Sequence, residues 1–203
     1  MKLYYAPGAC SLSPHIVLKE AGIAHEIVKV NLRQHQTESG EDYYKINPKG
    51  SVPAIAIDDQ TVLTEGAAIV QYIADHHAPQ LAPANGTLPR ARLQEMLNYI
   101  AAEYHKAFGP LFNPAASEEA RAAQREIVAK RLAYLDGVLS DGRPYIMGPD
   151  FTVADAYLFT CTRWCAAVKV PTEAFPHITA FMERMRARPA VQAAMAEEGL
   201  GKH

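Results

Sequence analysis

The chain has 203 residues, a formal net charge of −2 at pH 7 and 49% apolar residues. This apolar content supports a folded core, and the small net charge argues against a protein that coats nucleic acid. Only three cysteines are present, no apolar run is long enough to span a bilayer, and the N-terminus does not resemble a signal peptide. We therefore expect a cytoplasmic protein without disulfides, membrane partners or nucleic-acid partners.

The first 77 residues alternate between strand-like and helix-like segments. The predicted elements are a strand at 2–5, a helix at 11–22, a strand at 25–30, a hairpin at 54–57 and 61–63, and a helix at 66–77. A β-α-β unit requires a parallel pair, and the hairpin adds antiparallel strands. The pattern thus predicts a mixed four-stranded sheet with helices.

The second part of the chain contains no convincing strand. Its predicted helices cover 93–111, 118–139, a segment that opens at 151–155, 175–186 and 189–196. Thr152 is a natural N-cap, and Asp155 three residues later is close to a capping box. Prolines and Asn85-Gly86 before residue 90 indicate a linker. We expect an α/β domain at 1–80, a linker at 81–88 and an all-helical domain at 89–203.

Five segments together resemble one known family. They are PGACSLSPHI near the start, NPKGSVPA at 47–54, LTEGAAIVQYIAD at 63–75, LNYIAAEYHKAF at 97–108 and FTVADAYLF at 151–159. In this order they resemble the bacterial beta class of the cytosolic glutathione S-transferases. The resemblance implies a thioredoxin-like domain followed by an all-helical one, with glutathione as co-substrate, no prosthetic group and a homodimer.

Cys10 stands between the first predicted strand and the first predicted helix, where the helix N-terminus favours thiolate over thiol. By position alone, a reactive thiol and a small buried hydrophobe fit equally well. The resemblance implies that Cys10 contacts the glutathione sulfur and can form a mixed disulfide. Ser13 replaces the second cysteine of a C-x-x-C motif, so no local thiol resolves that disulfide. Ser11 is a further residue expected to contact glutathione, and we expect it to cap the helix or donate to sulfur. We expect His15 to make a structural hydrogen bond.

The resemblance also implies where the tripeptide binds in the first domain. Pro53 is expected to follow a cis peptide bond, which exposes the backbone of Val52 for pairing with the ligand. Glu65 is expected to accept from the γ-glutamyl ammonium, and the N–H of Gly66 to bind its carboxylate. His35 stands where the beta class commonly has a lysine for the glycyl end, and Lys49 is the alternative for that contact.

In the helical domain the resemblance implies a catalytic role for His105, which would stabilise a thiolate. The further residues expected near glutathione are Asn98, Ala102, Glu103, Tyr104 and Lys106. The seven-residue spacing of Asn98 and His105 predicts a shared helix face. Phe108, Phe112 and Trp164 are the candidates for a pocket that holds a hydrophobic electrophile. We expect no metal site, because no further Cys or His clusters beside Cys161 and Cys165.

Three functions remain open at this point. The favoured one is a glutathione S-transferase that conjugates glutathione to hydrophobic electrophiles for detoxification. The second is a thiol-disulfide oxidoreductase or reductive dehalogenase-like enzyme that uses Cys10 directly. The third is a non-catalytic binding module of the same fold, because fold alone does not give function.

Overall fold

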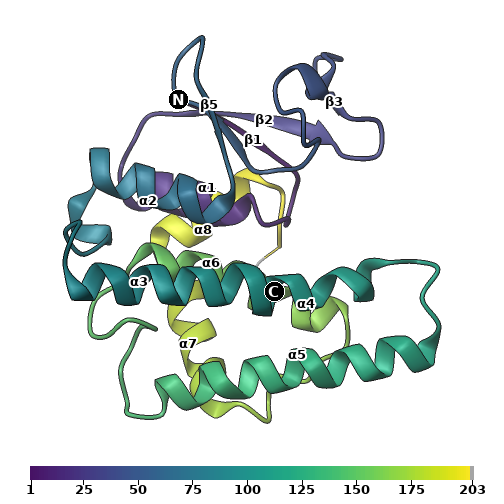
Figure 1. The fold of residues 1–203 in the computed structure, drawn as a ribbon, viewed down its shortest axis with the longest axis vertical. Helices are drawn as coiled ribbons and strands as arrows, with labels where there is room; N and C mark the ends of the chain where they lie inside the picture. Colours follow the sequence, from purple (N-terminus) through teal and green to yellow (C-terminus); the bar gives the residue numbers. More distant parts are fainter. Residues whose placement is uncertain (202–203) are drawn as a thin grey trace. The chain divides into compact units, whose positions relative to one another are not determined.

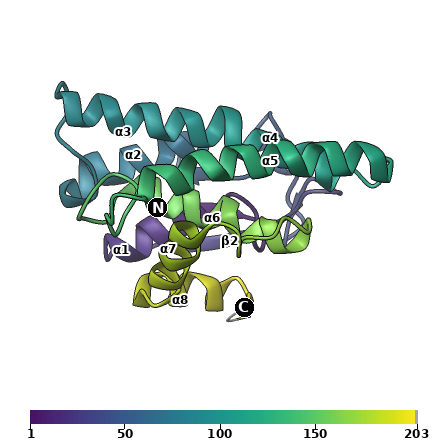
Figure 2. The ribbon, with the colours of Figure 1, turned by 90° about the horizontal axis from the view of Figure 1, so that it is seen from below.

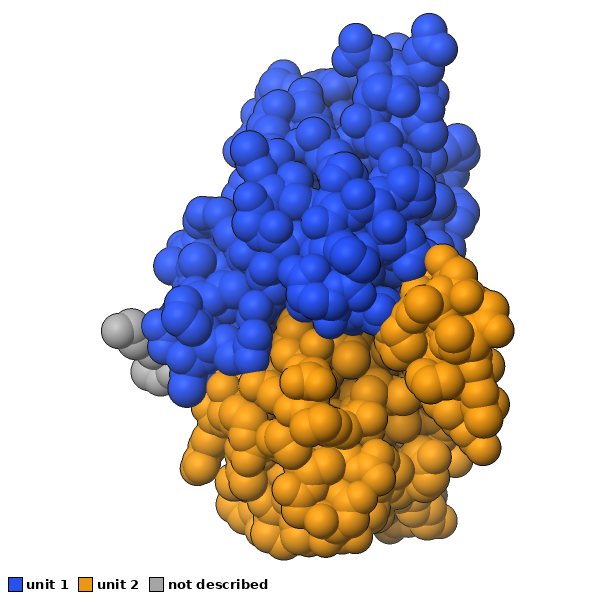
Figure 3. Space-filling view, turned by 90° about the vertical axis from the view of Figure 1, so that its left-hand side faces the viewer, with its two compact units in different colours: residues 1–82, 187–203 blue, residues 83–186 orange. Residues whose placement is uncertain are grey.

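The computed structural model describes residues 1–201, and these divide into two compact units (Figure 3). Residues 1–82 group with residues 187–201, and residues 83–186 form the second unit. This division differs from the predicted one at the C-terminal end. The last helix groups with the first unit because it packs on the first helix of the chain. Within residues 1–201, no helix is both long and apolar enough to cross a membrane.

The first unit is built on a mixed sheet with the strand order β3-β2-β1-β4-β5 (Figure 1). Its strands are β1 (Lys2–Tyr5), β2 (Glu26–Asn31), β3 (Gln36–Thr37), β4 (Ala54–Ala56) and β5 (Val62–Thr64). β1 pairs parallel with β2 and antiparallel with β4, as the sequence predicts. The fifth strand, β3, was not predicted, because a pair of residues is too short to show the period of two that marks a strand.

Two helices of the first unit lie side by side below the sheet in Figure 1, and the last helix of the chain packs on one of them. The helical elements are α1 (Leu12–Glu20), η1 (Tyr43–Lys45), α2 (Gly66–His77), η2 (Pro79–Leu81) and α8 (Pro189–Glu197). α1 contacts both α2 and α8. Lys19 and Glu197, which are 178 positions apart in the sequence, are therefore hydrogen-bonded in this unit.

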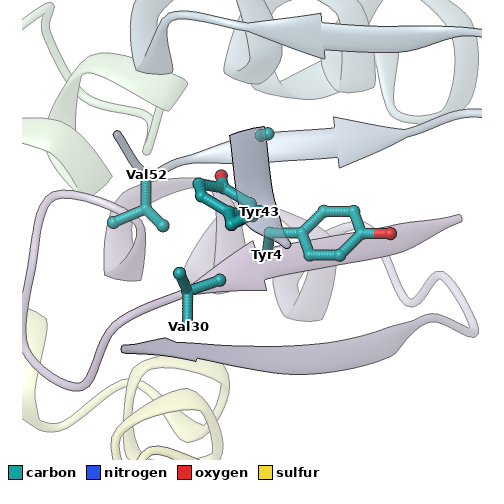
Figure 4. Packing of buried hydrophobic residues seen from close by; sticks show 5 residues of the cluster. Tyr4, Val30, Tyr43 and Val52 are labelled. Atoms are coloured by element: carbon teal, nitrogen blue, oxygen red, sulfur yellow. The ribbon is translucent and has the colours of Figure 1, made fainter. Parts of the chain in front are cut away.

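Neighbouring residues of β1 face opposite sides of the sheet, as a strand requires. Tyr5 faces α1, where its ring centroid lies 6.4 Å from that of His15. Tyr4 faces the other side and packs in a cluster with Val30, Tyr43 and Val52 (Figure 4). This cluster holds Val52, in the segment before β4 that carries the candidate site residues Val52 and Pro53.

The elements of the second unit, residues 83–186, are all helices (Figure 2). Its elements are α3 (Leu88–Tyr99), the π-helix η3 (Ile100–His105), α4 (Lys106–Phe108), η4 (Gly109–Phe112), α5 (Glu118–Leu139), α6 (Val153–Ala167) and α7 (Pro176–Arg186). α6 is buried over most of its length. Its predicted capping box is confirmed, since the Asp155 carboxylate accepts from the Thr152 N–H at 2.7 Å.

Candidate functional site

The turn between β1 and α1 holds Cys10. Its thiol donates a hydrogen bond to the carbonyl oxygen of Val52, with 3.2 Å between sulfur and oxygen. The Gly8 N–H donates to the Glu198 carboxylate at 2.9 Å, which ties the same turn to the end of α8. The sulfur is thus held beside the backbone that was expected to pair with a peptide.

Burial raises the pKa of the Cys10 thiol to about 11. The carboxylates of Glu65 and Glu198 raise it further, and the backbone N–H groups of Cys10 and Ser11 oppose the shift without cancelling it. The N–H groups at the helix start favour thiolate, as expected, but they do not give Cys10 a lowered pKa. Desolvation of the charged form is the larger effect here.

Ser11 makes neither of the two predicted interactions. Its side chain is buried, caps no N–H of α1 and makes no hydrogen bond with sulfur. Its hydroxyl oxygen accepts from the Ala6 N–H at 3.2 Å and lies 3.3 Å from the Ala6 carbonyl oxygen, to which it can donate. Ser11 therefore shapes the turn that carries Cys10.

The Val52-Pro53 peptide bond is cis, as the resemblance implied. The preceding Ser51 carbonyl accepts two hydrogen bonds, from the Asn47 side-chain amide at 2.7 Å and from the Tyr43 hydroxyl at 3.0 Å. No role was expected for Asn47 or Tyr43 from the sequence. Asn47 begins the stretch Asn-Pro-Lys-Gly. Its turn-forming residues were the only sequence feature that could have indicated a structural role for Asn47.

Glu65 is the residue before α2 and has a φ of 71°, which is uncommon for a residue with a side chain. Such backbone strain often occurs at functional sites. Its carboxylate is exposed and lies 2.5 Å from the Lys49 ammonium. Gly66 is the first residue of α2, so its N–H has no partner within the helix and points outward at the N-terminus.

His35 also has a positive φ, of 50°, and stacks on the ring of Tyr44 with 4.4 Å between centroids. Its Nδ1 is buried and finds no hydrogen-bond partner among residues 1–201. Lys49, the alternative for binding the glycyl end, is engaged by Glu65 and by the Thr64 hydroxyl. A role of His35 in binding glutathione remains a prediction.

His105, in the second unit, lies at the end of the π-helix. Its Nδ1 is 2.8 Å from the Tyr157 hydroxyl, and its ring centroid is 4.8 Å from that of Trp164. Burial, with a smaller effect of the Lys106 charge, lowers the pKa of His105. The neutral imidazole is therefore the main form at pH 7.

The π-helix changes the spacing argument for the neighbouring residues. Its hydrogen bonds run from i to i+5, so the face predicted from 3.6 residues per turn does not continue from Asn98 to His105. Asn98 is exposed, and its amide donates back to the Gln94 carbonyl at 2.8 Å. A π-helical turn was not predicted, since its sequence matches that of an amphipathic α-helix.

Tyr104 does not expose its side chain to a ligand. The residue is 0% exposed, and its hydroxyl donates to Thr162 at 3.2 Å and lies 3.5 Å from the Cys165 sulfur. Its place among the glutathione contacts is corrected to a core position. Glu103 forms an ion pair with Arg131 at 2.6 Å, whereas Ala102 and Lys106 are exposed.

The three residues predicted for an apolar pocket lie together. The Trp164 ring centroid is 5.4 Å from that of Phe108 and 5.8 Å from that of Phe112. Phe108 is fully buried, whereas Phe112 is 52% exposed. The cluster thus has a buried base and an exposed aromatic edge next to His105, which suits contact with an apolar molecule.

The comparisons with known proteins decide the family. The profile described as "Glutathione S-transferase, N-terminal domain" matches residues 8–76, and "Glutathione S-transferase, C-terminal domain" matches residues 99–189. The chain belongs to the glutathione S-transferase family. Glutathione S-transferase GstA of Escherichia coli O157:H7 is 50% identical over 202 residues, which are 98% of this chain and 100% of that protein.

Two solved bacterial glutathione S-transferases are similar over nearly the whole chain. A sphingomonad enzyme complexed with glutathione has 48% identity and a TM-score of 0.94, and covers 99% of this chain and 100% of its own. A beta-class enzyme of Sphingomonas chungbukensis has 45% identity and a TM-score of 0.95, with the same coverage. The predicted family, fold class and enzyme class are confirmed. The chain is a transferase that uses glutathione as co-substrate.

Proposed function

We propose that this glutathione S-transferase conjugates the glutathione sulfur to hydrophobic electrophiles, as in detoxification. The observation that carries the proposal is the contact of 3.2 Å between the Cys10 sulfur and the Val52 carbonyl. A peptide that pairs with Val52 as an added strand brings its cysteine close to Cys10. Glu65 and the N–H of Gly66 then receive the ammonium and carboxylate of the γ-glutamyl end.

The high pKa of Cys10 gives the residue a defined part in this proposal. When glutathione binds, the neutral thiol turns its one hydrogen from the Val52 carbonyl to the glutathione thiolate, and it does not compete with that thiolate as a nucleophile. The glutathione thiol loses its proton to solvent, and its sulfur attacks the electrophilic carbon. A carbon–sulfur bond forms, and the leaving group departs with the electron pair of the bond that breaks.

In the second unit we propose that His105 and Lys106 favour the thiolate by hydrogen bonding and positive charge. The aromatic cluster of Phe108, Phe112 and Trp164 is proposed to hold the apolar electrophile. Its mixture of a buried base and an exposed edge supports this assignment. Asn98, Ala102 and Glu103 have exposed positions and remain proposed neighbours of glutathione.

A second candidate reaction is thiol-disulfide exchange at Cys10. Its sulfur would attack a glutathione-bearing disulfide, form a mixed disulfide and release the other thiol as thiolate. All three cysteines are free thiols, so Cys10 is available for this step. Its raised pKa makes the attacking thiolate scarce at pH 7, which favours conjugation as the main activity. We further propose a homodimer in the cytoplasm, as the family resemblance implies.

Three variants test the proposal: Cys10→Ala, Glu65→Gln and, as a control, Glu95→Gln. Glu95 is an exposed residue of α3 that forms an ion pair with Arg92 at 2.8 Å. Conjugation is followed with an activated aryl chloride, and exchange with a mixed disulfide of glutathione. We expect Cys10→Ala to keep conjugation and lose exchange, Glu65→Gln to raise the KM for glutathione about tenfold, and Glu95→Gln to match the parent.

Other outcomes would contradict parts of the proposal. Loss of both activities in Cys10→Ala, with glutathione binding intact, would show that the main reaction of the protein uses the Cys10 sulfur directly. Failure of the parent chain to bind immobilised glutathione would instead support the non-catalytic module. An unchanged KM in Glu65→Gln would remove that residue from the γ-glutamyl site.

A further inference from the structure

A second cluster of polar side chains lies in the first unit, formed by α1, the turn before β2 and the end of α8. His15, His25 and Glu197 each offer one ligand atom, and these atoms lie within 4.8 Å of one another. The ring centroids of the two histidines are 5.5 Å apart, with their planes at 84°. The sequence places these residues up to 182 positions apart, so only the fold reveals the cluster.

The His25 ring is oriented as a metal ligand would be. Its Nδ1 donates to the Ile23 carbonyl at 2.6 Å, which leaves Nε2 with a free lone pair. This Nε2 is buried and finds no hydrogen-bond partner among residues 1–201. A buried, unpaired ring nitrogen is costly unless something binds it, and metal-ligating histidines usually donate their other N–H to a carbonyl or carboxylate.

His15 is also held through its Nδ1, but its Nε2 has a carboxylate partner. The residue is 0% exposed, and its Nδ1 lies 3.0 Å from the buried Glu198 carboxylate. Its Nε2 points to Glu197, with 3.0 Å between nitrogen and carboxylate oxygen. A metal ion bound here would take the place of the hydrogen between His15 Nε2 and the Glu197 carboxylate oxygen. The other oxygen of Glu197 pairs with Lys19 at 2.5 Å, which orients the carboxylate.

We propose that His15 Nε2, His25 Nε2 and Glu197 bind a divalent transition-metal ion, with Zn²⁺ as the expected occupant. Two imidazoles and one carboxylate are a common zinc ligand set, and they leave a fourth position for water. Nitrogen ligands disfavour Mg²⁺ and Ca²⁺. Ligands about 2.0–2.2 Å from a tetrahedral ion lie roughly 3.3 Å apart, so closure needs side-chain shifts of about an ångström. The ion would link α1 to α8.

The site can be reached from solvent through Glu197. Its side chain is 43% exposed, whereas His15 is fully buried. An ion can therefore enter from the surface and displace the proton without unfolding of the unit. The proposal does not depend on glutathione binding, because none of its three ligands belongs to the proposed glutathione site.

Metal binding is tested by equilibrium dialysis of an untagged Cys10→Ala chain against Zn²⁺, after removal of metal with a chelator. The Cys10→Ala background removes the most exposed thiol as a competing ligand. We expect one zinc ion per chain at micromolar zinc. His25→Ala and Glu197→Gln should each weaken binding at least about tenfold. His76→Ala is the matched control, since His76 is exposed and stacks on Tyr72.

Two further measurements separate metal binding from effects on folding. Zinc should raise the Tm of the parent and of His76→Ala, because a ligand of the native state stabilises it, and should leave the Tm of His25→Ala unchanged. A cobalt-substituted chain should show d–d bands without thiolate charge transfer. No zinc bound at 100 µM, equal binding by parent and both ligand variants, or a thiolate band would each overturn the proposal.

Discussion

The thiol of Cys10 should titrate far above pH 7 in the glutathione-free protein. Burial raises its pKa to about 11, and the carboxylates of Glu65 and Glu198 act in the same direction. With that pKa the thiolate fraction at pH 7 is about 10⁻⁴, against about 3 × 10⁻² for a free thiol of pKa ~8.5. Alkylation of Cys10 at pH 7 should therefore be about 300-fold slower than in the unfolded chain.

The assay is the rate of iodoacetamide modification of Cys10 between pH 6 and pH 12, followed by peptide mass spectrometry. The same peptide in denaturant serves as the reference. Restricted access lowers the rate at every pH, but it does not move the pH of half-maximal rate, so the midpoint reports the pKa. A midpoint at or below pH 8.5 in the folded protein would refute the reasoning, because desolvation would then not outweigh the helix N-terminus.

A charge substitution tests whether the Glu65 carboxylate raises the pKa of Cys10. Removal of the Glu65 carboxylate in Glu65→Gln should lower the pKa of Cys10, because a nearby negative charge disfavours thiolate. Glu26→Gln is the matched control, because Glu26 is exposed on β2 and pairs with Lys2. Equal midpoints in the two variants would show that Glu65 does not act on the sulfur electrostatically.

Two other predictions concern the second unit. Tyr157→Phe removes the hydroxyl 2.8 Å from His105 Nδ1 and should lower the kcat/KM of conjugation about 2–10-fold. The urea midpoint should fall only by the effect of losing that one hydrogen bond. An unaltered kcat/KM would show that the hydroxyl does not position His105. Asp155→Ala leaves the N–H groups of Ile146 and Thr152 without their acceptor and should cost about 2–4 kcal/mol in urea unfolding, whereas Asp150→Ala, at an exposed position, should cost less than 0.5 kcal/mol.

Local sequence determined much of the secondary structure. α2 and α5 begin and end where their periodicity predicts, and the Thr152–Asp155 spacing gives the observed capping box. These features depend on residues three or four positions apart, whose contacts are set within one helix. Family motifs likewise identified the cis bond before Pro53.

Features that depend on distant residues were not predictable in the same way. The pKa of Cys10 follows from its burial and from Glu198, which is 188 positions later. The π-helical turn before Lys106 and the core position of Tyr104 depend on packing against other helices, since the sequence there reads as an ordinary amphipathic helix.

The sequence by itself determined the elements, the family and the identity of most candidate residues, because periodicity, caps and motifs are local. Only the tertiary structure decided which side chains are charged and which distant side chains lie close together. Desolvation and Coulomb interactions act through space, so the protonated Cys10 and the approach of His15, His25 and Glu197 become visible only in the folded chain.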